Sequence, residues 1–298
     1  MRHSLTYYIT ILVIKLKGLK KKFSQNPIDF KKLRKEDVQY PKGSFFKQNI
    51  KRTFKVSNSL ITEIGLNDCS ENLLLFIHGG AFISGPAKHH WDTIKKIAQQ
   101  TDYTIWMCDY PKAPENKITE ISKNIDGIYT TAIAEYQSSK ILLLGDSVGG
   151  TLIASLLQRL VKKSLKLPHK IILVSPVMDA SMSNPEIEKV EKKDPMLSKI
   201  GVVSAKRMCI EDDNLRNILI SPVYGSFEQF PQTILFLAEN DITYPDQKIA
   251  VRKLLEAKVD LEIIEGKNML HIWPFLPVMK EAKISLNEII RILQKNAV

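Results

Sequence analysis

The sequence has 298 residues, of which 44% are apolar and 25% are charged, and its formal net charge is +11. A chain of this length and composition can bury one large core, and it contains no repeat or low-complexity segment. Its three cysteines, Cys69, Cys108 and Cys209, are odd in number and far apart. This spacing argues against a disulfide framework or a structural zinc site and favours a reducing cytoplasm.

The positive charge is concentrated in the N-terminal part of the chain. Residues 1–55 hold 15 Lys or Arg residues against three acids, a net of +12, so the remainder of the chain carries a net of −1. We expect no nucleic-acid partner, because these basic residues adjoin an apolar stretch and no nucleic-acid-binding motif accompanies them.

Residues 1–50 are expected to form a basic and apolar arm with cap helices. The apolar stretch from Leu5 to Leu16 is shorter than the ~20 residues that span a bilayer, and no small-residue cleavage site of a signal peptide follows it. One interpretation is a helix that covers the rest of the fold. The other is an interfacial helix through which residues 1–22 contact an anionic membrane. The two can coexist, so we expect a cytoplasmic protein, with membrane association as the open alternative.

Residues 51–298 are expected to form one α/β domain. A hairpin over residues 51–64 is predicted first, followed by short apolar runs that read as strands at 73–77, 103–108, 140–144, 170–174, 233–238 and 261–264. Segments compatible with helices lie between most of them, near 89–100, 118–137, 151–164 and 246–257, and a last one lies at 280–295. This alternation predicts a mostly parallel sheet with helices on both faces.

One interval breaks this alternation. Nearly 60 residues separate the strand at 170–174 from the strand at 233, and they contain five prolines. We expect a cap insertion at about residues 177–230, with helices of its own near 185–191 and 201–210.

The first predicted strand of the parallel part runs into His78-Gly79-Gly80-Ala81. Glycines at the end of a strand let backbone N–H groups point at a developing negative charge, as in an oxyanion hole. In this interpretation His78 orders the loop and is not a base.

The strand at 140–144 is followed by Gly145-Asp146-Ser147-Val148-Gly149 and then by a helical segment. A strand, a Gly-x-Ser-x-Gly turn and a helix make a nucleophile elbow, in which the serine hydroxyl stands on a tight turn and the N–H of the next residue, here Val148, is a further oxyanion donor.

A serine nucleophile needs a base and an acid that orients the base. Among the six histidines only His271 lies downstream of a further pair of strands, in a loop where an imidazole can reach the serine. The acid is expected at the end of the strand at 233–238, where Asp241 is the first choice and Glu239 and Asp246 are the alternatives.

With these motifs in place, the chain resembles the hormone-sensitive-lipase-like branch of the α/β-hydrolases, the bacterial family IV esterases. The matching pieces are His78-Gly79-Gly80-Ala81, Tyr110-Pro111-Lys112-Ala113-Pro114-Glu115, Gly145-Asp146-Ser147-Val148-Gly149-Gly150, Ser175-Pro176, Asp194-Pro195-Met196-Leu197, Ser221-Pro222, Asp241 and His271.

The resemblance implies an α/β-hydrolase fold with a helical cap and a triad of Ser147, Asp241 and His271. It also implies oxyanion donors at Gly80, Ala81 and Val148, with Gly79 shaping the turn, and a supporting role for Asp146 in ordering that loop. Two departures stand out. Ala81 replaces the third glycine of the family motif, and Pro111-Lys112 stands where the family usually has an arginine.

The expected activity is that of a serine carboxylesterase that needs no cofactor or metal and acts on small esters with short or medium acyl chains. The alternatives are a membrane-surface lipase or deacylase and a non-catalytic ligand-binding protein on the same scaffold. Trp91, Trp273 and Phe82 are interpreted either as pocket-lining or as core residues.

Overall fold

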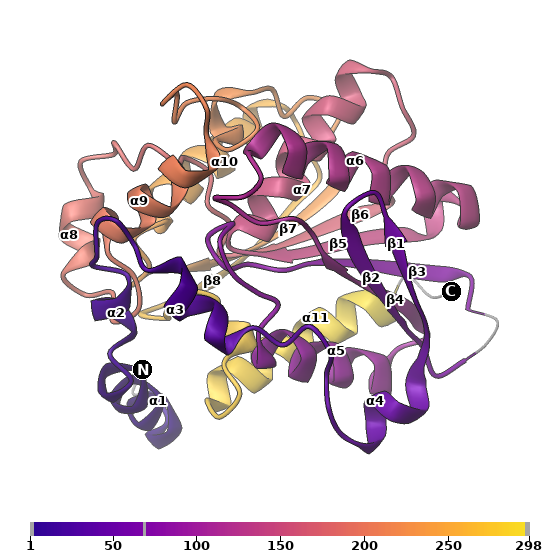
Figure 1. Ribbon diagram of the computed structural model, residues 1–298, viewed down its shortest axis with the longest axis horizontal. Helices are drawn as coiled ribbons and strands as arrows, with labels where there is room; N and C mark the ends of the chain where they lie inside the picture. Colours follow the sequence, from indigo (N-terminus) through magenta and orange to yellow (C-terminus); the bar gives the residue numbers. More distant parts are fainter. Residues whose placement is uncertain (1–2, 68–69, 296–298) are drawn as a thin grey trace.

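A computed structural model describes residues 3–67 and 70–295 and contains an eight-stranded sheet (Figure 1). The strands lie side by side in the order β1-β2-β4-β3-β5-β6-β7-β8. Their bounds are β1 Ile50–Val56, β2 Ser59–Ile64, β3 Asn72–Ile77, β4 Tyr103–Asp109, β5 Ile141–Asp146, β6 Lys170–Val174, β7 Gln232–Ala238 and β8 Leu261–Gly266.

The sheet is parallel from β4 to β8, and the hairpin of β1 and β2 adds an antiparallel edge. Every residue of β3, β5 and β6 is buried. Continuous burial is typical of parallel strands covered by helices on both faces, and it explains why these strands read as unbroken apolar runs.

Helices cover both faces of the sheet. In Figure 1, α6 (Ile118–Glu135), α7 (Val148–Lys162) and α10 (Tyr244–Glu256) lie on one face, while α5 (Lys88–Gln100) and α11 (Lys280–Gln294) lie on the other. The buried apolar residues accordingly form two clusters, one on each side of the sheet. This architecture confirms the predicted α/β-hydrolase fold, and the predicted strands and helices agree with the observed ones to within a few residues.

The N-terminal segment contains α1 (Leu5–Leu16), α2 (Leu19–Lys22), α3 (Phe30–Leu33) and, before the hairpin, α4 (Ser44–Asn49). The part of this segment around α2 and α3 lies near the carboxyl end of β5, where Leu19, Phe23 and Leu33 line the same cavity as Ser147. The 177–230 interval carries α8 (Ile187–Glu191) and α9 (Lys199–Cys209). The two segments pack together: the Ile28 N–H donates to the Ser204 hydroxyl at 2.9 Å, and a Cβ on Gly201 would lie 1.8 Å from the Phe23 carbonyl oxygen.

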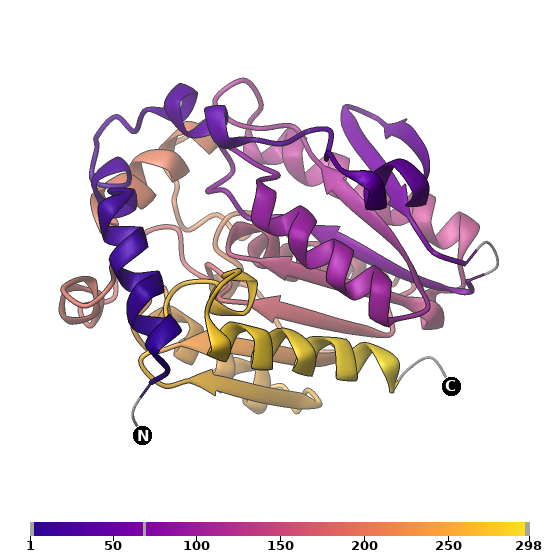
Figure 2. The same cartoon turned by 90° about the horizontal axis from the view of Figure 1, so that it is seen from below.

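Helix α1 lies beside α11, which Figure 2 shows from below. Its inner side buries Tyr7, Thr10 and Ile14, and the Tyr7 hydroxyl donates to the Asn268 carbonyl at 2.8 Å. Within the described residues, no helix has the length and apolar character needed to cross a bilayer. Cys108 and Cys209 are buried free thiols, and Cys69 lies outside the described residues.

Candidate active site

Ser147 stands between the end of β5 and the start of α7, in the turn that its sequence predicts. Its backbone is strained, with φ 51° and ψ −121°, a region that L-residues rarely occupy. The turn also needs Gly149, because a Cβ there would lie 1.9 Å from the Ile77 carbonyl oxygen of the neighbouring strand. The strained turn holds the Ser147 side chain at the carboxyl end of the sheet, next to the N-terminus of α7.

A chain of hydrogen bonds joins the three predicted triad residues. His271 Nε2 lies 2.9 Å from Ser147 Oγ, and His271 Nδ1 lies 2.6 Å from Asp241 Oδ2. The other oxygen of Asp241 accepts a hydrogen bond from the Thr243 N–H at 2.8 Å, which fixes the plane of the carboxylate. In the tautomer with the proton on Nδ1, the Nδ1–H group donates a hydrogen bond to Asp241, and Nε2 is free to accept the serine proton.

The charges around His271 favour its protonated form. Burial lowers the pKa of this imidazole, but the Asp241 carboxylate, together with the charges of Asp194 and Asp146, raises the pKa above its usual 6.5. A second buried carboxyl, Asp194, accepts from the Ile242 N–H at 3.0 Å. Burial and then the charge of Asp241 raise the pKa of Asp194.

Neither alternative acid contacts His271. Glu239 accepts a hydrogen bond from the Asn268 N–H at 2.8 Å. Asp246 is buried in the first turn of α10, and burial raises the pKa of its carboxyl to about 7. Of the three acids considered from the sequence, Asp241 is the one whose carboxylate reaches the imidazole.

The loop after β3 has the backbone conformation that its glycines predict. Gly80 has φ +121°, and Ala81 and Phe82 follow with φ 56° and 65°. Ala81 therefore adopts a left-handed conformation that glycine would occupy more easily. Within the described chain, the N–H groups of Gly80, Ala81 and Val148 donate no hydrogen bond to other protein atoms. Such free donors near a serine hydroxyl can stabilise an oxyanion.

Asp146 fastens this loop to the elbow. One of its oxygens accepts from the Gly79 N–H at 3.0 Å, and His90 Nε2 lies 3.3 Å from the same carboxylate. Burial raises the pKa of the Asp146 carboxyl, but His90, His89 and the hydrogen bond from the Gly79 N–H together lower it to about 2. Asp146 is therefore an anion that bridges the oxyanion loop and α5.

His78 is also a support of the loop. It is fully buried, its ring stacks on Tyr110 at 4.5 Å, and its Nδ1 lies 2.6 Å from the Gly79 carbonyl oxygen. Burial lowers the pKa of this imidazole, so the ring is neutral at pH 7. These contacts agree with the interpretation of His78 as an ordering residue.

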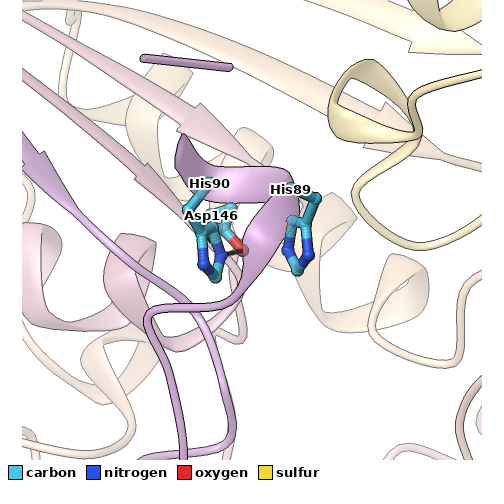
Figure 3. A group of neighbouring side chains, drawn as sticks. All are labelled: His89, His90 and Asp146. Carbon is cyan, nitrogen blue, oxygen red and sulfur yellow. Dashed lines mark hydrogen bonds and ion pairs between the residues drawn. The ribbon is translucent and has the colours of Figure 1, made fainter. Parts of the chain in front are cut away.

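His89, His90 and Asp146 form a group that offers three metal-ligand atoms within 4.8 Å of one another (Figure 3). A cation would have to compete with existing contacts, because Asp146 holds Gly79 and His90 Nδ1 accepts from the Ala87 N–H at 2.9 Å. His90 and Asp146 are therefore already engaged, with the loop after β3 and with the start of α5.

The Ser147 side chain faces a pocket of about 160 Å³ whose walls are mainly apolar. The N-terminal segment contributes Leu19, Phe23 and Leu33, and the 177–230 interval contributes Val177, Met196, Leu197, Val202 and Lys206. Trp91, Trp273 and Phe82 are buried and do not line this pocket. The structure therefore supports their interpretation as core residues.

A guanidinium group does stand beside the Ala113-Pro114-Glu115 turn, but it comes from the N-terminal segment. Arg34 donates from Nε to the Ile83 carbonyl at 2.7 Å and from Nη2 to the Ala113 carbonyl at 2.6 Å. Both of its terminal nitrogens also bind the Glu115 carboxylate. This contact ties the N-terminal segment to the loops around the oxyanion donors.

Sequence reasoning missed His90, Arg34 and Lys206. Their partners are at least 49 positions away along the chain: His90 contacts Asp146, Arg34 contacts Ile83, and Lys206 contacts Phe82. No local pattern marks them, since their residue types and spacings are ordinary for helix surfaces.

The family model for the alpha/beta hydrolase fold matches residues 74–275, which is more than half of the chain. The chain belongs to this family. An esterase of Acinetobacter venetianus is 26% identical over 234 residues, which cover 76% of this chain and 77% of the relative. The esterase LipU of Mycobacterium tuberculosis is 23% identical, with 70% and 69% covered.

Solved structures agree with these relatives. A candidate esterase from Staphylococcus aureus is 26% identical, with a TM-score of 0.80 and 88% and 90% of the two chains covered. An esterase of the bacterial hormone-sensitive lipase family is 22% identical with a TM-score of 0.87 over the full length of both chains, which shows a shared fold. The predicted resemblance to hormone-sensitive-lipase-like esterases is thus confirmed, and the relatives support carboxylic ester hydrolysis.

Proposed function

We propose that this α/β-hydrolase is a serine carboxylesterase that cleaves short- to medium-chain esters through an acyl-enzyme intermediate. The observation that carries the proposal is the continuous chain from Asp241 through His271 to Ser147, with contacts of 2.6 and 2.9 Å. A serine hydroxyl bonded to an imidazole, which is itself oriented by a carboxylate, is the arrangement of an activated nucleophile.

In the proposed mechanism, Ser147 Oγ attacks the ester carbonyl carbon while His271 Nε2 takes the hydroxyl proton. The carbonyl oxygen becomes an oxyanion that accepts hydrogen bonds from the N–H groups of Gly80, Ala81 and Val148. When the C–O bond breaks, His271 donates the proton to the leaving alcohol and Ser147 stays acylated. Water then attacks the acyl-enzyme with His271 as base, and the acid and free Ser147 are released.

The size of the pocket supports the preference for short or medium acyl chains. Its volume of about 160 Å³ is below the ~300 Å³ at which pockets for drug-sized ligands begin. Leu19, Phe23 and Met196 line it, so a small apolar acyl group would be in contact with apolar side chains.

The Ser147→Ala variant tests the proposal. We expect turnover of short-chain nitrophenyl esters to fall by on the order of 10⁴- to 10⁶-fold with an unchanged circular dichroism spectrum, because the nucleophile is lost but the fold is not. A fluorophosphonate probe should label the wild-type protein at Ser147. Folded wild-type protein that neither reacts with the probe nor hydrolyses any ester would favour the non-catalytic binding protein instead.

A second proposal is that α1 docks this enzyme on an anionic membrane surface. Leu5, Ile9, Leu12 and Leu16 are exposed on its outer side, together with Tyr8 and Val13. Lys15 and Lys17 are exposed at its C-terminal end and Lys21 is exposed on α2, whereas Lys20 donates to main-chain carbonyls and Lys22 binds Glu36. An exposed apolar stripe flanked by lysines is typical of interfacial helices, so the membrane-surface lipase stays the alternative function.

A further inference from the structure

Lys206 is a fully buried lysine in the wall of the pocket that faces Ser147. It lies on α9, its side chain has 0% exposure, and its Nζ has no hydrogen-bond partner among the described residues. An ammonium group has three N–H donors, and leaving them unpaired in an apolar environment is costly. Burial accordingly lowers the pKa of Lys206 to about 7. A buried ionisable group with a perturbed pKa in the wall of a pocket is a candidate ligand-binding group.

The contacts that Lys206 does make leave its charge without a counter-ion. Its Nζ lies 4.3 Å from the centroid of the Phe82 ring, a cation–π contact that attracts the charge but accepts no hydrogen bond. Cys209, one turn further along α9, does not supply an anion, because burial raises the pKa of its thiol to about 12.

The carboxylates that line the same pocket are already engaged elsewhere. Glu36 binds Lys22, Asp37 accepts from the Gly85 N–H at 2.6 Å, and Asp146 holds Gly79 and His90. Lys206 is therefore an amine in the pocket wall that the described carboxylates leave unpaired, and a bound anion would favour its protonated form.

Its position relates it to the reaction. Phe82 directly follows Ala81, so the ammonium group lies beside the same loop that carries two of the predicted oxyanion donors. The Lys206 side chain has no exposed surface, so it has to turn toward the pocket before an anionic group of an ester bound at Ser147 can pair with it.

We propose that Lys206 forms an anion-binding subsite and that the substrates of this enzyme are esters that also carry a carboxylate. This inference rests on the proposed esterase function and narrows its substrate class. The apolar walls contact the hydrocarbon part, and the ammonium group pairs with the free carboxylate, which the apolar walls alone would not solvate.

The test compares esters that differ only at the distal end. Monomethyl glutarate carries the carboxylate on the acyl side, and its partner has an isopropyl group of similar size in place of the carboxylate. In a second pair, the acetyl ester of γ-hydroxybutyrate carries the carboxylate on the alcohol side, and its partner has an isopropyl group in that position. Hydrolysis is followed by pH-stat titration, and the measured quantity is the ratio of kcat/KM for the anionic ester to kcat/KM for its neutral partner.

In Lys206→Met, a side chain of similar length and no charge, we expect this ratio to fall by on the order of 10- to 100-fold for one of the two pairs, the size of one hydrogen bond to a charged group. The pair that responds identifies whether the acyl or the alcohol part reaches Lys206. The matched control is Arg207→Met, which removes a charge from the exposed side of the same helix and should leave both ratios unchanged.

A merely structural role for Lys206 predicts a different result. If Lys206 only holds Phe82 in place, Lys206→Met would lower kcat/KM equally for anionic and neutral esters, and constant ratios would overturn the proposal. Lys206→Gln, which keeps a donor but not the charge, gives the same comparison if the Met variant does not fold.

A binding experiment separates this inference from the proposed catalytic function. Calorimetry on Ser147→Ala should detect glutarate binding, and addition of Lys206→Met should weaken it by about tenfold or more. If the wild-type enzyme hydrolysed no ester but glutarate bound in this way, the esterase proposal would fail and the subsite would stand. Glutarate binding that does not depend on Lys206 would reject the subsite.

Discussion

At the scale of single residues, His271 lies between a hydroxyl and a carboxylate, and its protonation depends on both. Burial alone would keep the imidazole neutral, but the Asp241 carboxylate at 2.6 Å raises its pKa above 6.5. Only the neutral form can accept the proton of Ser147, so activity should be lost as the pH falls through the raised pKa.

The pH profile of kcat/KM tests this balance. We expect the acid limb of the wild-type profile to have a midpoint above 6.5. Asp241→Asn should lower turnover by on the order of 10⁴-fold and move the midpoint to lower pH, because the charge that stabilises the imidazolium is gone. The control is Glu239→Gln, a neighbouring carboxylate that binds Asn268 rather than His271. An unshifted midpoint in Asp241→Asn would mean that another group controls the acid limb.

At the scale of elements, the site depends on how the N-terminal segment is fastened to the sheet. Arg34, directly after α3, binds two main-chain carbonyls, Ile83 and Ala113, and the Glu115 carboxylate. The carbonyl contacts are partly buried, whereas Glu115 is half exposed. Exposed ion pairs contribute little because water and salt screen them, so the main-chain contacts should account for most of the stabilisation.

Two variants separate these contributions. Arg34→Met should lower the free energy of unfolding by about 1–3 kcal/mol, because carbonyls lose a charged hydrogen-bond donor. Glu115→Gln should lower it by less than about 1 kcal/mol. Urea denaturation followed by tryptophan fluorescence gives both values. Equal losses in the two variants would show that the ion pair, and not the carbonyl contacts, holds the segment.

At the scale of the whole molecule, the charge and the apolar surface are both asymmetric. Residues 1–55 carry a net of +12, while the remainder carries −1. The exposed apolar side of α1 belongs to this basic part, so one region of the surface combines positive charge with an apolar stripe. That combination suits an anionic lipid surface better than a neutral one.

Vesicle sedimentation tests this surface. The wild-type protein should bind phosphatidylserine-containing vesicles more tightly than pure phosphatidylcholine vesicles, and high salt should weaken the binding. Replacing Leu5, Ile9, Leu12 and Leu16 by Gln should reduce binding by about tenfold or more, since four apolar side chains no longer leave water. These positions spare Leu19 and Phe23, which line the pocket.

The matched control replaces Leu165 and Leu255, two exposed apolar residues on the α7 and α10 side of the sheet, away from α1, by Gln. It should bind vesicles like the wild type. If the wild type ignores vesicles and instead forms dimers that the α1 substitutions abolish, a second copy of the chain covers the stripe and the membrane proposal is wrong.

The sequence by itself determined the fold class and the order of the motifs. Buried parallel strands read as apolar runs, and a tight turn between a strand and a helix needs its glycines, as at Gly149, so both features leave local patterns. The choice of Ser147, Asp241 and His271 also came from local context, because each follows a strand that ends at the same edge of the sheet.

Only the tertiary structure decided the contacts between distant segments. The sequence favoured Asp241 as the acid but kept Glu239 and Asp246 as alternatives, and it did not reveal that His90 meets Asp146 or that Lys206 lies over Phe82 without a counter-ion. It also left open which side of α1 faces water. The physical reason is that burial and charge pairing depend on which side chains are in contact in the folded chain, and the spacing of residues along the sequence does not specify contacts between distant segments.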